Sequence, residues 1–200
     1  MLNGVLVKNY AAPSVDRREI LRYAGCRGEA DERTLALLEE CLAAAESVNA
    51  YRVCYRVFDV KQKNGFLEIG NLKTDSKALR AHLDGSAKAV VFAATLGLGI
   101  DRLIAKYAGV ATAKAAMLQA IGAERIEALC DIFCAELKAE HGDVSARFSA
   151  GYGDFPLAAQ KEIFEMLDCP RQIGLTLNDS LLMSPTKSVT AIVGKRTSTP

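Results

Sequence analysis

The stretch "KAVVFAATLG" (Lys88–Gly97) is an uninterrupted apolar run of strand length. Such a run is typical of a strand that is covered on both faces of its sheet. The stretch "YRVCYRVFDV" (Tyr51–Val60) instead alternates large apolar side chains with Arg52, Cys54 and Arg56. That alternation predicts a half-buried strand. Two strands of different character therefore define a sheet.

A hairpin signal follows the alternating strand. Asn64-Gly65 is a dipeptide that favours a tight turn, and "FLEIG" (66–70) supplies a returning strand. Helix signals surround the strands. Ser14 is predicted to cap a helix that ends at Gly25, and Asp31 precedes a second helix. The apolar face of this second helix would consist of Leu35, Leu38, Leu42 and Ala45. A short helix is predicted before Gly85, so the chain is of mixed α/β (α+β) class.

Composition excludes several functional classes. The 200 residues are 50% hydrophobic and 24% charged, with a formal net charge of +1. This balance gives no reason to expect a nucleic-acid or membrane partner. No signal peptide is recognisable, and no apolar run approaches the ~20 residues of a membrane span. The six cysteines show no Cys-x-x-Cys spacing, so reduced thiols and a cytoplasmic location are expected.

The most informative helix is predicted from Val110 to Glu140. One apolar stripe comprises Leu118, Ile121, Ile126, Leu129, Phe133 and Leu137, and a face of small residues comprises Ala113, Ala116, Ala120, Ala123 and Cys134. Glu127 falls in the small face, where a buried carboxylate would need a cationic or hydrogen-bonding partner. Two interpretations stay open: a structural ion pair with Arg125 or Arg147, or a ligand contact. Asp131, one turn later, is a second candidate carboxylate.

A glycine-rich turn, "TLGLGIDRL" (95–103), joins the buried strand to a helix that should start near Ile100. A helix start after glycines can bind phosphate through free backbone N–H groups. The dinucleotide fingerprint requires a third glycine, and Arg102 stands in its place. A tight strand-to-helix connection is therefore the favoured interpretation, and a nucleotide site is the alternative.

The stretch "ARFSAGYGDFPLAAQKEIFEML" (146–167) is the strongest candidate for a ligand loop. Arg147 presents a planar guanidinium that suits a carboxylate. Gly151 and Gly153 would let backbone groups approach a ligand, and Tyr152 offers an aromatic face with a hydroxyl. The structural alternative is a turn that leads into a helix at Pro156. These residues alone favour a site for a small molecule that carries a carboxylate.

The same loop carries a family resemblance. "RFSAGYGDFP", "QKEIFEMLD", "IGLTLNDSLLMSPTKSVTAIVG" and "VVFAATLGLGIDRLI" resemble the activation domain of cobalamin-dependent methionine synthase, over roughly Lys88–Gly194. The similarity is closest to the short, stand-alone members. It implies a twisted antiparallel or mixed sheet packed with helices. It also implies one activation-type domain over residues 1–200, with a helical part at 1–50, a sheet and ligand-binding core at 51–194 and a tail at 195–200.

The resemblance also implies a ligand and its contacts. In the family the domain binds S-adenosylmethionine, and Arg147 matches the arginine that holds the methionine carboxylate. Tyr152 matches the tyrosine of the Gly-Tyr pair, and Ala150 and Gly151 would supply backbone contacts. Glu127 is the better match to the helix glutamate that meets the ligand, with Asp131 as the alternative.

Cobalamin is expected on a partner. The lower-face cobalamin motif Asp-x-His-x-x-Gly is incomplete at "RAHLDG", because Arg80 replaces the aspartate; His82 is interpreted as a solvated helix residue. The resemblance implies a corrinoid-binding methionine synthase subunit, or a related corrinoid protein, as partner. It also implies a flavodoxin-like electron donor. The function implied is a methyltransferase component that supports reductive remethylation of cob(II)alamin.

A second function stays open at this point. The family's large members carry a further ligand-contacting tyrosine after the last strand, and "GKRTSTP" (194–200) has no aromatic residue. The N-terminal aspartate contact of those enzymes also has no identifiable counterpart. The alternative is therefore a non-catalytic docking subunit of a corrinoid methyltransferase that no longer binds S-adenosylmethionine.

Overall fold

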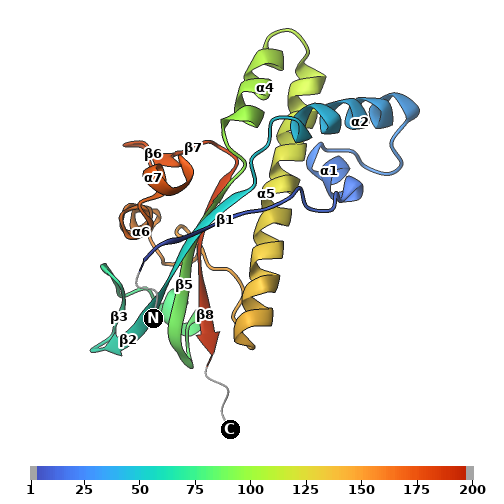
Figure 1. Ribbon diagram of the computed structural model, residues 1–200. Helices are drawn as coiled ribbons and strands as arrows, with labels where there is room; N and C mark the ends of the chain where they lie inside the picture. The colour runs from blue at the N-terminus through green and yellow to red at the C-terminus, as the bar shows by residue number, and fades with distance from the viewer. Residues whose placement is uncertain (1–3, 197–200) are drawn as a thin grey trace.

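The computed structural model describes residues 4–196 and contains a six-stranded antiparallel sheet flanked by helices (Figure 1). The sheet strands are β1 Leu6–Asn9, β2 Arg52–Lys63, β3 Phe66–Ile69, β4 Leu72–Thr74, β5 Ser86–Thr95 and β8 Ser188–Arg196. A separate hairpin pairs β6 Thr176–Leu177 with β7 Met183–Ser184. The helices are α1 Arg17–Tyr23, α2 Glu32–Glu46, α3 Lys77–His82, α4 Leu98–Ala108, α5 Thr112–His141, α6 Gln160–Leu167 and α7 Cys169–Ile173, with a 3₁₀ turn at Leu157–Ala159. This is the α+β class expected from the sequence.

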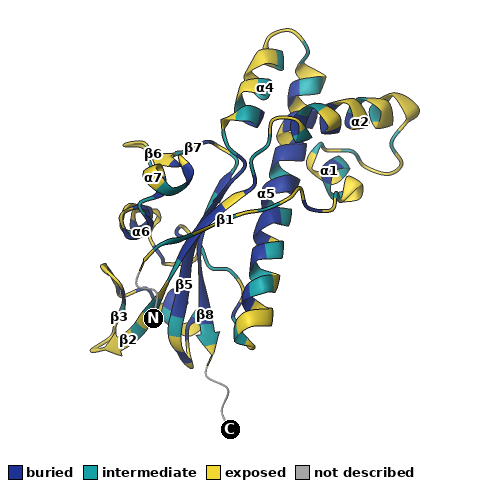
Figure 2. Cartoon of the chain, viewed as in Figure 1, coloured by how far each residue is buried: buried dark blue, intermediate teal, exposed yellow. Residues whose placement is uncertain are grey.

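The centre of the sheet is β5, which lies between β2 and β8 in the order β4-β3-β2-β5-β8. Every residue of β5 from Ala89 to Thr95 is buried, which confirms a strand covered on both faces (Figure 2). The long strand β2 pairs with β1 through its first residues and with β3 through its last, so β1 and β3 share one edge. The hairpin at Asn64-Gly65 is confirmed. Strand β1 is not predicted from the sequence, because four residues of mixed polarity give too weak a pattern.

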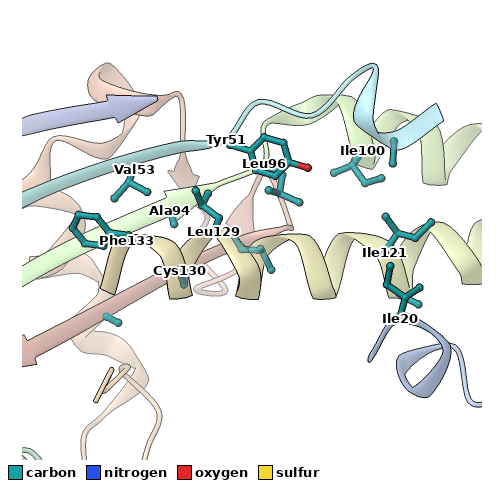
Figure 3. Packing of buried hydrophobic residues seen from close by; sticks show 14 of the residues in the cluster. Ile20, Tyr51, Val53, Ala94, Leu96, Ile100, Ile121, Leu129, Cys130 and Phe133 are labelled. Carbon is teal, nitrogen blue, oxygen red and sulfur yellow. The ribbon is translucent and has the colours of Figure 1, made fainter. Parts of the chain in front are cut away.

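Helix α5 crosses one face of the sheet and builds the larger hydrophobic core (Figures 1 and 3). Phe133 packs against the ring of Phe92 on β5 and that of Tyr55 on β2, with ring centroids 4.9 and 5.1 Å apart. All six residues of the predicted apolar stripe are buried. The opposite face of the sheet is covered by α6 and α7, whose core includes Ile163 and Leu167.

Several sequence expectations are wrong in detail. Asp16, not Ser14, caps α1, where its carboxylate accepts hydrogen bonds from the N–H groups of Arg18 and Glu19. Leu35 is exposed, because the buried face of α2 is formed by Leu38, Cys41, Leu42 and Ala45. Cys54 is fully buried in β2, since helices cover both faces of the sheet at that point. Ala113 and Ala116 are exposed at the start of α5, which extends beyond the sheet (Figure 2).

The buried carboxylate of α5 belongs to Glu124, not Glu127. Glu124 and Arg125 are 4% and 0% exposed, and the Arg125 Nε lies 2.6 Å from Glu124 Oε2. The guanidinium also donates to the backbone carbonyls of Pro13 and Ser14, at 2.7 and 2.6 Å. Burial by itself would lower the pKa of Arg125, but the contact with Glu124 raises it overall. This pair therefore ties the segment before α1 to α5.

The glycine-rich turn before α4 is explained by packing. A Cβ on Gly99 would lie 2.2 Å from the carbonyl oxygen of Val48, so only glycine fits there. Gly97 has a φ of 75° and caps the helix. Asp101, in the first turn, accepts hydrogen bonds from the N–H and hydroxyl of Thr186. These contacts support the tight connection rather than the nucleotide site.

Two general features concern residues 4–196. No helix within this range is long and apolar enough to span a membrane. The same residues contain no group of three or more His, Cys, Asp or Glu side chains placed to hold a metal ion.

Candidate ligand-binding site

A cavity of about 420 Å³ lies where the loop after α5 meets α6 and the start of β8. A volume of this size is within the range of small-molecule sites. The residues that line it are Glu127, Ala146, Arg147, Ser149, Ala150, Tyr152, Gln160, Met183, Ser188, Val189 and Thr190. The wall therefore combines an arginine, a carboxylate, an amide and several apolar groups.

Arg147 is held at the edge of this cavity by two carboxylates of α5. Its Nη2 lies 3.0 Å from Glu127 Oε2 and 2.8 Å from Asp131 Oδ1. The arginine side chain is 25% exposed, whereas those of Glu127 and Asp131 are 46% and 69% exposed. Both ion pairs thus remain open to water, and such pairs exchange partners at little cost.

The electrostatic environment keeps Arg147 cationic. Burial alone would lower its pKa, but the neighbouring carboxylates of Glu127 and Asp131 contribute to raising it overall. Two thiols, Cys130 and Cys134, lie close to the guanidinium. Burial raises the pKa of Cys130 to about 12 and that of Cys134 to about 11. Both thiols are therefore protonated at neutral pH, and the guanidinium can interact with an anionic ligand.

The loop itself is a compact turn. Gly151 has a φ of 94°, a backbone conformation that favours glycine. Its N–H donates a hydrogen bond to the Phe155 carbonyl at 2.8 Å. The loop joins the sheet at Phe148, whose N–H and C=O both pair with Ile192 of β8. Tyr152 is 59% exposed and its ring meets that of Phe148 edge-on, with centroids 5.9 Å apart.

The structure brings most of the predicted site residues to one place. Arg147, Ala150, Tyr152 and Glu127 line the 420 Å³ cavity, and Asp131 reaches it only through its ion pair with Arg147. Gly151 does not line the cavity, and its N–H donates to the Phe155 carbonyl within the loop. Glu127 also borders a second cavity of about 490 Å³, which Asp131 lines as well, beside Pro13 and Asp16.

Comparison with known proteins identifies the family. Residues 80–199 match the family described as "Vitamin B12 dependent methionine synthase, activation domain". The chain belongs to this family. Its fold is similar to that in the "Crystal Structure of the MetH Reactivation Domain bound to AdoHcy". That similarity has a TM-score of 0.72 and 18% sequence identity, and it covers 98% of this chain and 80% of the other. No curated protein matches the chain significantly.

Asp154 is a residue of this activation domain that the sequence did not reveal as important. Its carboxylate accepts hydrogen bonds from the Ser76 hydroxyl at 2.6 Å and from the backbone N–H groups of Lys77 and Ala78 at 2.8 and 3.0 Å. It therefore joins the glycine-rich loop after α5 to the first turn of α3. Gly153 supports this contact, because a Cβ there would lie 2.9 Å from the Cβ of Ala78. The partners are 76 to 78 residues away, so no local pattern shows the contact.

His82 is also tied to the loop, which corrects its interpretation as a solvated histidine. Its Nε2 lies 2.7 Å from the Ala146 carbonyl oxygen and 2.9 Å from the Ser145 hydroxyl. Its ring packs on Phe148, with centroids 4.8 Å apart. The last turn of α3 and the glycine-rich loop after α5 lie together in the fold, although His82 and Ser145 are 63 positions apart in the sequence.

We expect Asp154→Ala to weaken ligand binding roughly tenfold, because the loop would spend less time in its binding conformation. The hydrogen bond from Ser76 and those from the N–H groups of Ala78 and Lys77 hold the pKa of Asp154 at about 2, below its ordinary value of 3.8. A lowered carboxyl pKa gives stability that is present above about pH 4 and lost as the pH falls toward 2.

Acid unfolding curves and ligand titrations of the Asp154→Ala variant measure both effects. Asp179→Ala, in the exposed turn of the β6–β7 hairpin, is the control. Wild-type binding and wild-type acid unfolding in Asp154→Ala would contradict the assigned role of this contact.

Proposed function

We propose that this activation domain binds S-adenosylmethionine in the 420 Å³ cavity. It would thereby support reductive remethylation of cob(II)alamin on a corrinoid-carrying partner. The observation that carries the proposal is the position of Arg147. Its guanidinium lies in the cavity wall, is partly buried and is paired with the carboxylates of Glu127 and Asp131 on α5. The reactivation domain of similar fold was crystallised with AdoHcy. AdoHcy (S-adenosylhomocysteine) has the amino-acid and adenosyl groups of S-adenosylmethionine and lacks only its methyl group.

The charges in the cavity suit this ligand. Arg147 would exchange its contact with Asp131 for the ligand's carboxylate, which a guanidinium binds with two parallel hydrogen bonds. Glu127 is adjacent and would face the α-amino group and the sulfonium, both of which are cationic. Ala150, Met183 and Val189 offer the apolar surface that the adenosyl group needs.

The chain's task in this reaction is positioning. The partner's cobalamin, once reduced, would accept the methyl group, and the chain would hold the sulfonium in line with it. Arg147 would hold the amino-acid end of the ligand. Asp154 anchors the loop that carries Arg147, so the loop would keep this end of the ligand in a fixed position. The proposal includes a corrinoid-binding methionine synthase subunit as partner, and a flavodoxin-like protein as the electron donor. Residues 1–200 would act as one domain, as the extent of the structural match supports.

The direct test is methyl transfer from S-adenosylmethionine labelled in its methyl group. The protein is mixed with a methionine synthase that lacks its own activation domain and carries cob(II)alamin, together with a low-potential reductant. We expect label on the cobalamin only when both this chain and the reductant are present. The Arg147→Ala variant should transfer much less label. Arg171→Ala serves as the matched control, because Arg171 is 80% exposed and pairs with Asp168 in a different part of the chain. Equal transfer with and without this chain would overturn the proposal.

A docking subunit without ligand binding is the second candidate. The observation that favours it is the double ion pair of Arg147, which already engages the Nη2 of the guanidinium with two carboxylates. In that case Arg147→Ala would leave association with the corrinoid protein unchanged, and no S-adenosylmethionine would bind. Sedimentation of the two proteins together, with and without the ligand, separates the two functions.

A further inference from the structure

The segment that leads to Arg147 follows the outer edge of β8 and contains one extra residue. Val144 pairs with Lys195 and Phe148 pairs with Ile192, both in antiparallel bridges. Val144 and Phe148 are four positions apart in the sequence, whereas Ile192 and Lys195 are three positions apart. An extra residue between two such pairs is a β-bulge, which interrupts the ladder and redirects the side chains that follow. Residues 145–147 therefore form a bulge against β8.

The bulge decides which face of the sheet Arg147 occupies. Val144 packs against the core beneath α5, whereas Phe148 packs against the core of α6 and α7 on the opposite face. Residues four positions apart in a regular strand lie on the same face, so the alternation is reversed within the bulge. Arg147 consequently lies on the α5 face, where its Nη2 reaches Glu127 and Asp131. A strand without the extra residue would direct position 147 to the other face.

His82 of α3 contacts the bulge on both sides of Arg147. Its Nε2 lies 2.7 Å from the carbonyl oxygen of Ala146. Because a carbonyl oxygen can only accept, the Nε2 carries a proton and donates this hydrogen bond. The second partner of the same carbonyl is the Ser145 hydroxyl, at 3.0 Å, which belongs to the bulge itself. The imidazole ring packs on Phe148, with centroids 4.8 Å apart, so both sequence neighbours of Arg147 are held by one side chain.

We propose that His82 is a positioning residue of the site, which holds the bulge in the geometry that aims Arg147 at the ligand's carboxylate. This inference rests on the proposed function, because it concerns the same arginine and ligand. His82 does not line the 420 Å³ cavity, so it acts on the ligand through Arg147. Without the hydrogen bond to Ala146, the bulge samples other arrangements. The affinity for the carboxylate then falls with the fraction of chains in which Arg147 is correctly placed.

The test compares two thioethers, S-adenosylhomocysteine and 5′-methylthioadenosine. Both contain the adenosine group and the sulfur, but only the first has the amino-acid group. Both are titrated calorimetrically into the full chain, and the ratio of their affinities reports on the carboxylate contact. We expect the parent protein to prefer S-adenosylhomocysteine. His82→Phe keeps a ring against Phe148 but removes the donor, and it should reduce this preference roughly 3- to 10-fold, the effect of one hydrogen bond.

Three further variants show whether the effect belongs to positioning. His82→Gln supplies an N–H donor at a similar reach, so it should recover most of the preference. In an Arg147→Ala background, His82→Phe should cause no further loss, because residues that act through one contact are not additive. His141→Phe is the matched control, since His141 is the chain's other histidine and lies in the last turn of α5. It should leave the preference unchanged.

The outcomes separate this inference from the proposed function. If the parent chain prefers S-adenosylhomocysteine and His82→Phe keeps the full preference, the assignment of His82 is wrong and the proposed function stands. An equal loss of affinity for both compounds in His82→Phe would also overturn the assignment, because it indicates a general structural contribution. A further loss in the Arg147→Ala background would show that His82 acts on another contact. If neither compound binds to the parent chain, the inference and the proposed function both fail.

Discussion

An Arg147→Ala variant should bind S-adenosylmethionine roughly 30- to 150-fold more weakly than the parent chain, a loss of about 2–3 kcal/mol. The variant removes the charge-assisted hydrogen bonds to the ligand's carboxylate and leaves Glu127 and Asp131 without their counter-ion. These two carboxylates would then repel the ligand's own carboxylate. Equilibrium dialysis with labelled ligand measures the change.

The fold of Arg147→Ala should remain intact, because its ion pairs are solvent-accessible and contribute little to stability. Thermal unfolding of the variant checks this point. Arg147→Lys keeps the charge but not the planar fork, so its affinity should fall between those of the parent and the alanine variant. Full affinity in Arg147→Ala would show that the carboxylate binds elsewhere.

Arg125→Ala should cause the largest loss of stability, about 3–5 kcal/mol in the free energy of unfolding. The guanidinium is fully buried and makes hydrogen bonds to Glu124 and to the carbonyls of Pro13 and Ser14. Its removal leaves the Glu124 carboxylate buried without a cation and releases the segment before α1. Urea unfolding followed by circular dichroism gives the difference. The midpoint of thermal unfolding should fall by roughly 10 °C.

Arg17→Ala is the matched control for this prediction. Arg17 also pairs with a glutamate, Glu39, at 2.6 Å, but the side chains are 56% and 55% exposed. An exposed pair of this kind contributes little to stability. If the two variants lost the same stability, the buried pair would not be the anchor of the N-terminal segment.

Much of the fold could be predicted because its signals are local. The buried strand β5, the turn at Asn64-Gly65 and the stripe of α5 follow from short-range patterns. The failures concern features that depend on distant partners. Cys54 is buried because α6 and α7 cover the far face of the sheet, and β1 forms because β2 extends past β3 at that edge.

The candidate site shows the same division. Arg147 and the glycine-rich loop are visible as an unusual cluster in the sequence, and the family resemblance implies ligand-binding roles for them. The roles of Asp154 and His82 were missed, because they lie in contacts between α3 and the loop after α5. Helical periodicity also assigned burial to Glu127 rather than Glu124. Glu124 is buried because the N-terminal segment lies over it, and the Asp16 N–H of this segment donates a hydrogen bond to the Glu124 carboxylate.

Calorimetric titration of S-adenosylmethionine into the purified chain tests the central claim most directly. We expect saturable binding at one site per chain. We also expect a large excess of S-adenosylhomocysteine, which keeps the carboxylate and the adenosyl group, to compete for that site. Absence of heat and of competition at ligand concentrations up to the millimolar range would contradict it. The cavity beside Arg147 would then be a feature of a docking module rather than a ligand site.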